Sequence, residues 1–236
     1  MTTYRMVYGD DETVVRETYQ NIDDIQREDG WLILFRGRNA ILRVQEQHVH
    51  SIEETPVPAR AVVDVLSQRN AGFATHQFSP ELRMLPVLKT ILLGCVDPRV
   101  DPAQVLSLDL GEAAIMRNVG GRVTPGVLHE LAMLRGVTQA QGGDFGPAWN
   151  LVVLQHTDCG ITRLAAQTDL LAAFFNVAPG AVPQIDDPVA AVERDVAAIR
   201  SQPQLPAGCL VSGLVYDVAT GSLKTVVDPS PLRPGA

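Results

Sequence analysis

The sequence predicts an α/β fold: a mostly parallel sheet covered by helices on both faces, with a small β-rich module in front of it. Unbroken apolar runs at 90–94 and 151–154 are typical of strands that are buried on both faces. Segments with helical spacing of apolar residues follow these runs, and strands that alternate with helices imply a parallel sheet. The chain of 236 residues is long enough for one large domain and a small appendage.

The other elements of the α/β part follow from local signals. Asp101-Pro102 and Thr124-Pro125 each combine an N-cap residue with a proline in the first turn, which predicts a helix start at each place. A strand is expected between these two starts. The remaining expected elements are a helix at 61–68, the strand at 113–116, helices at 161–175 and 188–200, and a closing strand pair at 210–216 and 223–227. The last of the helices shows an ordinary solvated charged face.

The first 57 residues have the composition of a separate module. They carry 11 acids and 6 bases, a net charge of -5 out of -8 for the whole chain. Prolines in the stretch 55–58 interrupt both helix and sheet and mark a linker. We therefore expect a module at 1–57, too small for a deep core of its own, followed by the α/β domain at 58–236. The strands expected in the module at 1–57 are a hairpin formed by 31–35 and 40–44 and short strands at 3–8 and 48–52.

The charge balance argues against two classes of partner. The chain has 27 acids and 19 bases, a net charge of -8, whereas nucleic-acid grooves and anionic membrane surfaces need clustered Lys and Arg. No stretch reaches the roughly 18 apolar residues that a membrane span needs, and the first residues do not resemble a signal peptide. We expect a cytoplasmic protein with no nucleic-acid or membrane partner.

Candidate metal ligands follow two of the predicted buried strands. The first strand runs into Cys95, and the strand at 151–154 runs into His156 and Cys159. Ligands collect at the carboxyl ends of strands in open α/β sheets. Two thiolates and one imidazole form a common zinc-ligand set that leaves the fourth position open for catalysis. The alternatives are buried structural side chains, or a Cys–His nucleophile pair that leaves one cysteine unexplained.

Asp97 and Arg99 follow the first of these cysteines. A carboxylate beside the open metal position could orient a metal-activated water, and an arginine would hold it away from the metal through a bidentate pair. The competing interpretation is an ordinary ion pair at a helix start.

These motifs together resemble the β-class carbonic anhydrases. Cys95-x-Asp97-x-Arg99 is followed by His156-Thr157-Asp158-Cys159-Gly160, which is similar to the family's His-Ser/Thr-Asp-Cys-Gly signature. The segment 116–124 is similar to the family's Arg-Asn-Ala-Gly stretch, and 214–221 to its closing strand and turn. The resemblance covers about residues 61–228 and leaves the first 57 unexplained.

The resemblance implies a function and a set of roles. Cys95, His156 and Cys159 would hold Zn²⁺, with Asp97 as the catalytic carboxylate and Arg99 as its partner. The reaction would be the reversible hydration of carbon dioxide to bicarbonate and a proton by zinc-bound hydroxide. The family forms dimers or larger assemblies, so a homodimer or higher homo-oligomer is expected.

Three departures from the family pattern bear on the site. Pro98 stands where the family has a small residue, and it could lock the preceding aspartate in one of its two positions, paired with the arginine or on the metal. Val119 replaces the usual alanine. Many members carry a bicarbonate-binding glutamine before the first strand, and Gln77 lies nearby in this sequence without aligning to it.

Two alternative functions stay open. Related enzymes hydrolyse carbonyl sulfide or carbon disulfide on the same zinc site. A catalytically silent zinc-binding protein, with a partner-binding module at 1–57, is the alternative from another class. Among other residues, His76 and His129 are candidate proton relays, Arg117 and Asn118 would shape the wall of the site or cap a loop, and Cys209 is expected in the core.

Overall fold

The chain divides into two compact units, Met1–Pro80 and Glu81–Ala236. The structure is a computed structural model that describes residues 2–10, 13–56 and 59–233. Val57 and Pro58 of the expected linker lie outside the described residues. Helix α1 (Ala59–His76), longer than the expected helix at 61–68, belongs to the first unit. The expected division into a module at 1–57 and an α/β domain at 58–236 stays a prediction.

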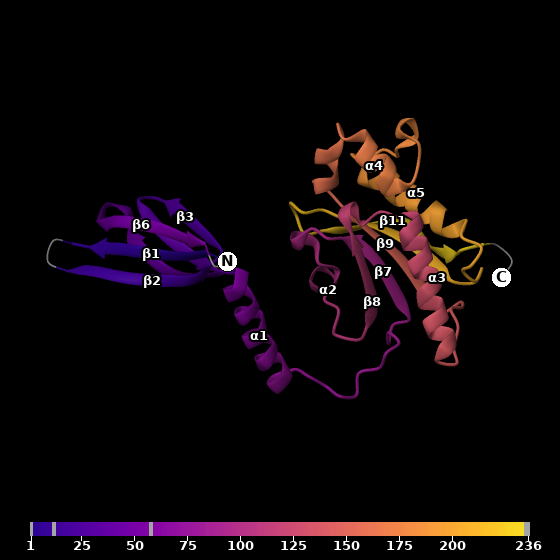
Figure 1. Ribbon diagram of the computed structural model, residues 1–236, viewed down its shortest axis with the longest axis horizontal. Helices are drawn as coiled ribbons and strands as arrows, with labels where there is room; N and C mark the ends of the chain where they lie inside the picture. Colours follow the sequence, from indigo (N-terminus) through magenta and orange to yellow (C-terminus); the bar gives the residue numbers. More distant parts are fainter. Residues whose placement is uncertain (1, 11–12, 57–58, 234–236) are drawn as a thin grey trace. The chain divides into compact units, whose positions relative to one another are not determined.

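The first unit contains two three-stranded antiparallel sheets, with the strand orders β2–β1–β6 and β3–β4–β5 (Figure 1). Its strands are β1 (Thr2–Gly9), β2 (Val14–Ile22), β3 (Asp24–Glu28), β4 (Trp31–Arg36), β5 (Asn39–Gln45) and β6 (Val49–Pro56). The expected hairpin is confirmed as β4–β5, and the two further expected strands as β1 and β6. Strands β2 and β3 were not expected.

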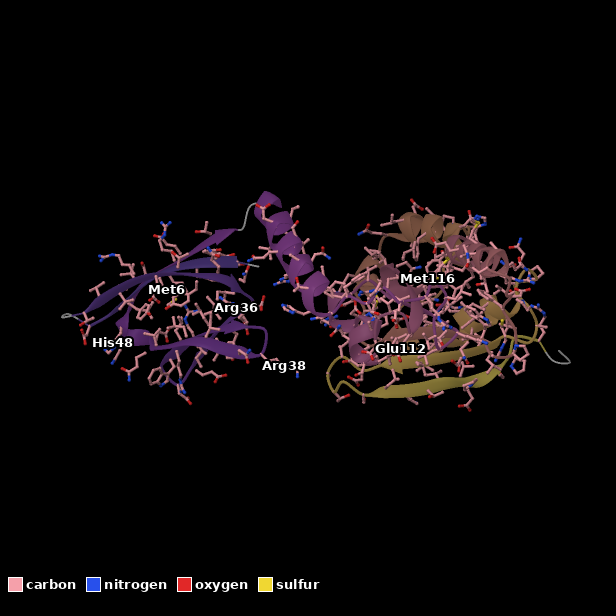
Figure 2. All side chains as sticks on the ribbon, turned by 90° about the horizontal axis from the view of Figure 1, so that it is seen from below. Met6, Arg36, Arg38, His48, Glu112 and Met116 are labelled. Atoms are coloured by element: carbon pink, nitrogen blue, oxygen red, sulfur yellow. The ribbon has the colours of Figure 1, made fainter. Side chains whose placement is uncertain are left out.

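The first unit has a small core of its own, formed between its two sheets. Met6 and Ile22 of one sheet pack with Leu32 and Leu34 of the other. Met6 and Leu34 are fully buried, and Figure 2 shows Met6 between the two sheets. Two small sheets packed face to face bury apolar side chains that one hairpin would leave exposed.

The second unit is built on a five-stranded sheet with the order β11–β10–β9–β7–β8. Four strands are parallel, and β11 pairs with β10 in the antiparallel direction at one edge. The strands are β7 (Thr90–Cys95), β8 (Ala113–Asn118), β9 (Asn150–His156), β10 (Leu210–Tyr216) and β11 (Leu223–Pro231). All five correspond to expected strands.

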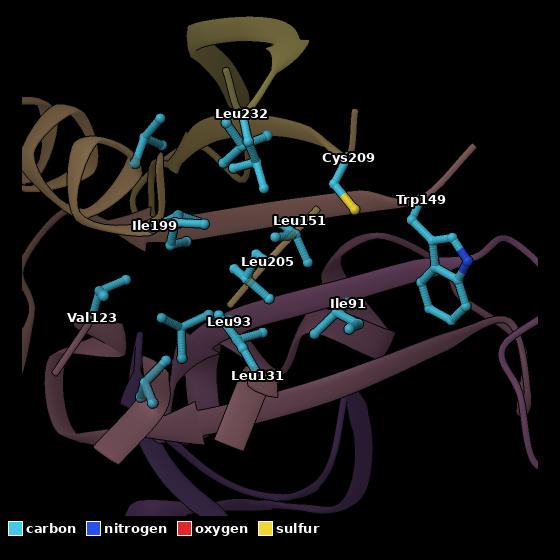
Figure 3. Packing of buried hydrophobic residues seen from close by; sticks show 14 of the residues in the cluster. Ile91, Leu93, Val123, Leu131, Trp149, Leu151, Ile199, Leu205, Cys209 and Leu232 are labelled. Atoms are coloured by element: carbon cyan, nitrogen blue, oxygen red, sulfur yellow. The ribbon is translucent and has the colours of Figure 1, made fainter. Parts of the chain in front are cut away.

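Helices cover both faces of this sheet, as expected. The helices α3 (Pro125–Ala140) and α5 (Pro188–Arg200) pack on one face, where their apolar residues join those of β7, β9 and β10 in the main core (Figure 3). The close approach of α5 requires Gly213 in β10, because a Cβ there would lie 2.1 Å from a methyl carbon of Val192. On the opposite face, the short helix α2 (Pro102–Val105) lies against Gly94.

One expected helix is wrong. The segment expected as a single helix at 161–175 contains a 3-10 helix, Gly160–Leu164, and the separate helix α4 (Thr168–Phe175). The backbone of Gln167, with φ -99° and ψ 60°, leaves the helical region between them. The apolar spacing of the whole segment therefore reflects two short helices that bury the same side.

Within the described ranges, no helix is long and apolar enough to cross a membrane.

Candidate metal centre

The parallel pairing of β7 and β9 brings the candidate ligands together. These strands are neighbours in the sheet, and Cys95 and His156 are their last residues. Cys159 follows three residues after His156, at the start of the 3-10 helix. Since parallel strands end at the same edge of a sheet, all three side chains lie at one place.

The three side chains form a compact and buried cluster. The sulfur atoms of Cys95 and Cys159 lie 3.7 Å apart, and the ligand atoms of Cys95, His156 and Cys159 all lie within 4.8 Å of one another. The three residues are between 2 % and 6 % exposed. Zn–S and Zn–N bonds of about 2.0–2.3 Å fit a group of donors at these separations. The sequence-based expectation that these residues converge is confirmed.

The orientation of His156 is the strongest indication that the cluster suits a metal ion. Its Nδ1 lies 2.8 Å from the carbonyl oxygen of Thr157, so Nδ1 carries the proton and Nε2 presents a lone pair. Nε2 is buried and has no hydrogen-bond partner in the described part of the chain. A buried polar atom without a partner costs about 1–3 kcal/mol, and metal coordination removes that cost. A carbonyl partner on the other ring nitrogen is typical of metal-binding histidines.

The two cysteines have opposite pKa shifts. The hydrogen bond from Cys159 lowers the pKa of the Cys95 thiol, although burial opposes the shift. The same contact, together with burial, raises the pKa of Cys159. For His156, burial lowers the pKa but is outweighed by contacts with Cys95 and Thr157, and the net pKa is raised. Metal ligands must be deprotonated, so a cation that binds to this thiol–thiolate pair and imidazole displaces protons from them.

Asp97 is held by Arg99 in a bidentate pair beside the cluster. Arg99 donates from Nε to Oδ1 at 3.1 Å and from Nη2 to Oδ2 at 2.8 Å, and its backbone N–H also donates to Oδ1 at 2.9 Å. These bonds lower the pKa of Asp97 to about 2. The carboxylate is therefore ionised at neutral pH. Arg99 also donates from Nη1 to the Asp158 carboxylate at 2.9 Å, so this guanidinium connects both ligand-bearing loops.

Pro98 is compatible with the arginine-paired position of Asp97. Asp97 is the N-cap of a 3-10 turn over 98–100, and Pro98 stands at its first position, where no backbone N–H is needed. Of the two positions open to the aspartate, this structure has the one paired with arginine.

Arg117 and Asn118 have separate roles, which the sequence left undecided. Arg117, at the end of β8, donates to the carbonyl oxygens of Cys95 at 2.8 Å and Asp97 at 2.9 Å, and it also pairs with Asp101. It therefore fixes the backbone that carries the first ligand. Asn118 closes a loop, because its side chain bonds both the N–H and the C=O of Arg122 at 2.8 Å.

One buried ion pair near the site was missed by sequence reasoning. Arg122 donates to both carboxylate oxygens of Asp195, at 2.7 and 3.2 Å, and the side chains are 1 % and 3 % exposed. Asp195 belongs to α5, so the expectation of an ordinary solvated charged face on that helix is wrong for this residue. The two residues are 73 positions apart, and no local spacing could indicate their contact.

The other candidates are exposed or lie in the core. His129 and His76 are exposed, and Gln77 is exposed in the first unit. Cys209 is fully buried in the main core, as expected. A small cavity of about 30 Å³ borders His156 and Cys159 on the side of Arg122 and α5.

Comparisons with known proteins agree with this fold and cluster. The family model described as carbonic anhydrase matches residues 90–204. "Beta-carbonic anhydrase 1" of Mycobacterium tuberculosis is 28 % identical over 169 residues, which cover 70 % of this chain and 98 % of that protein. A crystal structure of carbonic anhydrase from Streptococcus mutans shares 31 % identity and a TM-score of 0.56, and the match covers 70 % of this chain and 96 % of that one.

A second group of relatives is named for a different activity. The "carbon disulfide hydrolase" of Acidithiobacillus thiooxidans is 27 % identical over 159 residues, covering 56 % of this chain and 73 % of that protein.

The chain belongs to the β-carbonic anhydrase family. It is thus an enzyme of a zinc-dependent family, and Cys95, His156 and Cys159 are its grouped candidate metal ligands.

Proposed function

We propose that Cys95, His156 and Cys159 hold Zn²⁺ and that the protein catalyses the reversible hydration of carbon dioxide to bicarbonate and a proton. The observation that carries this proposal is the buried, unpartnered Nε2 of His156, within 4.8 Å of two cysteine sulfurs. The donor set of two sulfurs and one nitrogen suits Zn²⁺ and leaves a fourth position for the reaction. The family of the chain supports the same assignment.

A zinc ion bound there supplies Lewis-acid activation of water at near-neutral pH. The role that we assign to Asp97 follows from its charge and its restraint. It is ionised and can only accept hydrogen bonds, so it orients the attacking water through one of that water's protons. We assign to Arg99 the role of holding this carboxylate beside the metal ligands rather than on them.

The test is stopped-flow carbon dioxide hydration with zinc content measured on the same sample of full-length protein. The proposal predicts one zinc ion per chain and catalysis at neutral as well as alkaline pH, because Asp97 is already paired with Arg99. Catalysis only at alkaline pH would show that the aspartate closes the site in solution. Full zinc with no hydration at either pH would contradict the proposed reaction and favour the silent zinc-binding protein.

Carbon disulfide or carbonyl sulfide hydrolysis is the second candidate function. The similarity to the hydrolase of Acidithiobacillus thiooxidans specifically favours it. Both reactions add water to a linear heterocumulene, so the same metal and carboxylate can serve either substrate. Sulfide release from carbon disulfide, measured on the preparation used for the hydration assay, separates them by the ratio of kcat/KM values.

We also propose that the protein works in the cytoplasm as a homodimer or larger homo-oligomer. Val96 and Val119, which flank the candidate site, are 49 % and 47 % exposed. Exposed apolar side chains next to a site are typical of a surface that a second subunit covers. Light scattering during gel filtration checks this: a mass of about 51 kDa or more is expected from the 25.5 kDa chain, and a monomer would contradict it.

A further inference from the structure

The loop after β8 touches the first candidate metal ligand directly. The backbone N–H of Asp97 donates to the sulfur of Cys95 at 3.4 Å, and the loop packs against the backbone of the same cysteine. Gly121 packs so closely on the end of β7 that a Cβ there would lie 2.8 Å from the backbone nitrogen of Cys95. Gly120 and Gly121 have φ values of 79° and 59°, which only glycine adopts readily. The position of this loop therefore constrains the backbone that carries the Cys95 sulfur.

Three side chains hold the loop in place. Asn118 closes it by bonding the backbone of Arg122, as described above. Gln155, which is buried beside His156, donates from Nε2 to the carbonyl oxygen of Gly121 at 2.6 Å. The third is Arg122 itself, whose guanidinium reaches away from the loop to Asp195 on α5. Of these three, the arginine is the one that ties the loop to a helix on the face of the sheet.

The Arg122–Asp195 pair fixes the orientation of the guanidinium but is expected to add little net stability. Its two parallel hydrogen bonds fix the guanidinium in one plane, which lies over the ring of Phe175 with Cζ 5.2 Å from the centroid. Nη1 also donates to the carbonyl oxygen of Gln184 at 3.3 Å. Burying both charges costs nearly as much as their attraction returns, and an apolar pair of similar volume is often as stable. The need to hold the loop in one position explains why a buried ion pair is found here rather than an apolar pair.

We propose that Arg122 and Asp195 are positioning residues of the metal centre, which hold the 119–121 loop against the backbone of Cys95 and thereby fix where its sulfur lies. This inference rests on the proposed metal site. Groups outside the ligand set that fix the orientation of a ligand change the metal affinity and the electronic character of the metal centre. The pair acts through the loop and contacts neither metal nor substrate.

The experiment separates positioning from stability by replacing both members with apolar residues. The double variant R122M/D195L keeps the buried volume without buried charge, so its free energy of unfolding is expected to stay close to that of the wild type. The control is R135M/D144L, which removes a partly exposed bidentate pair with both bonds at 2.8 Å, in which Arg135 belongs to α3. Asp195→Asn is the second variant, nearly isosteric, in case the double variant folds poorly.

Two measurements on full-length protein report on the sulfur. In Co²⁺-substituted protein, we expect the sulfur-to-cobalt charge-transfer band of R122M/D195L and Asp195→Asn to shift. We also expect their zinc dissociation constants to rise by about 10- to 100-fold. The control should change neither quantity, and Arg122→Lys should recover part of the affinity because it restores one charged contact to Asp195.

An unchanged band and an unchanged zinc dissociation constant in a folded R122M/D195L protein would overturn the positioning role. Equal changes in the control would overturn it too, since the effect would then not be specific to this loop. A wild-type protein that binds neither Zn²⁺ nor Co²⁺ would contradict the metal centre itself, which is a distinguishable failure.

Discussion

Replacing Gly121 by alanine should damage both stability and the metal centre. The residue has a φ of 59°, and a left-handed conformation costs a residue with a Cβ about 1–2 kcal/mol. The added Cβ would also lie 2.8 Å from the backbone nitrogen of Cys95 and the carbonyl carbon of Gly94. These backbone atoms cannot rotate away as a flexible side chain would, so overpacking adds about 1–3 kcal/mol. The total expected loss is about 2–5 kcal/mol.

Urea unfolding of the zinc-loaded protein measures this loss, and zinc content on the same sample reports on the ligand. The control is Gly136→Ala within α3, where a new Cβ meets nothing within 4 Å. That variant should gain about 0.5–1 kcal/mol, because alanine restricts the unfolded chain and favours the helix. If Gly121→Ala stays within about 0.5 kcal/mol of the wild type and keeps its zinc, the loop does not press on Cys95 as described.

Three further predictions concern the cluster and its carboxylate. Cys159→Ser should weaken zinc binding by more than about 100-fold, the upper loss expected when a group that only bonds to a ligand is removed. Full zinc retention in a dialysis assay would exclude Cys159 as a ligand. Asp97→Ala should keep zinc but lower kcat/KM for hydration by about 100-fold, and unchanged turnover would remove it from the mechanism. Arg99 lowers the folded-state pKa of Asp97 to about 2 from 3.8, so the pair's contribution to stability is present above pH 4 and is lost as the pH falls toward 2. At constant zinc content, the pH–activity profile should therefore show no ionisation of Asp97 between pH 5 and 9.

The parts of the fold that were predictable are those with a strong local signal. The strand β7 is a run of apolar residues because it is buried on both faces, and α3 begins where Thr124 caps Val127 with Pro125 in its first turn. Strands β2 and β3 carry many polar residues on exposed sides, so their apolar alternation is weak. The residues of the small core in the first unit could not all be named from the sequence, because Ile22 comes from the unexpected strand β2.

The candidate site was predictable for a different reason. Cys95 and His156 end two strands, and Cys159 follows three residues after His156. Parallel pairing brings these strand ends together, however the helices pack on the sheet. The pairing of Arg122 with Asp195 depends instead on how α5 crosses the sheet, which the spacing of apolar residues does not specify. The break at Gln167 was also missed, because both parts of the segment keep their apolar side chains on the same side.

Zinc content and carbon dioxide hydration, measured together on one full-length preparation, test the central claim most directly. The account predicts one zinc ion per chain and hydration at neutral pH, both lost when zinc is removed and both recovered when it is restored. A well-folded protein that takes up no zinc, or that is fully loaded yet hydrates no carbon dioxide at neutral or alkaline pH, would contradict it.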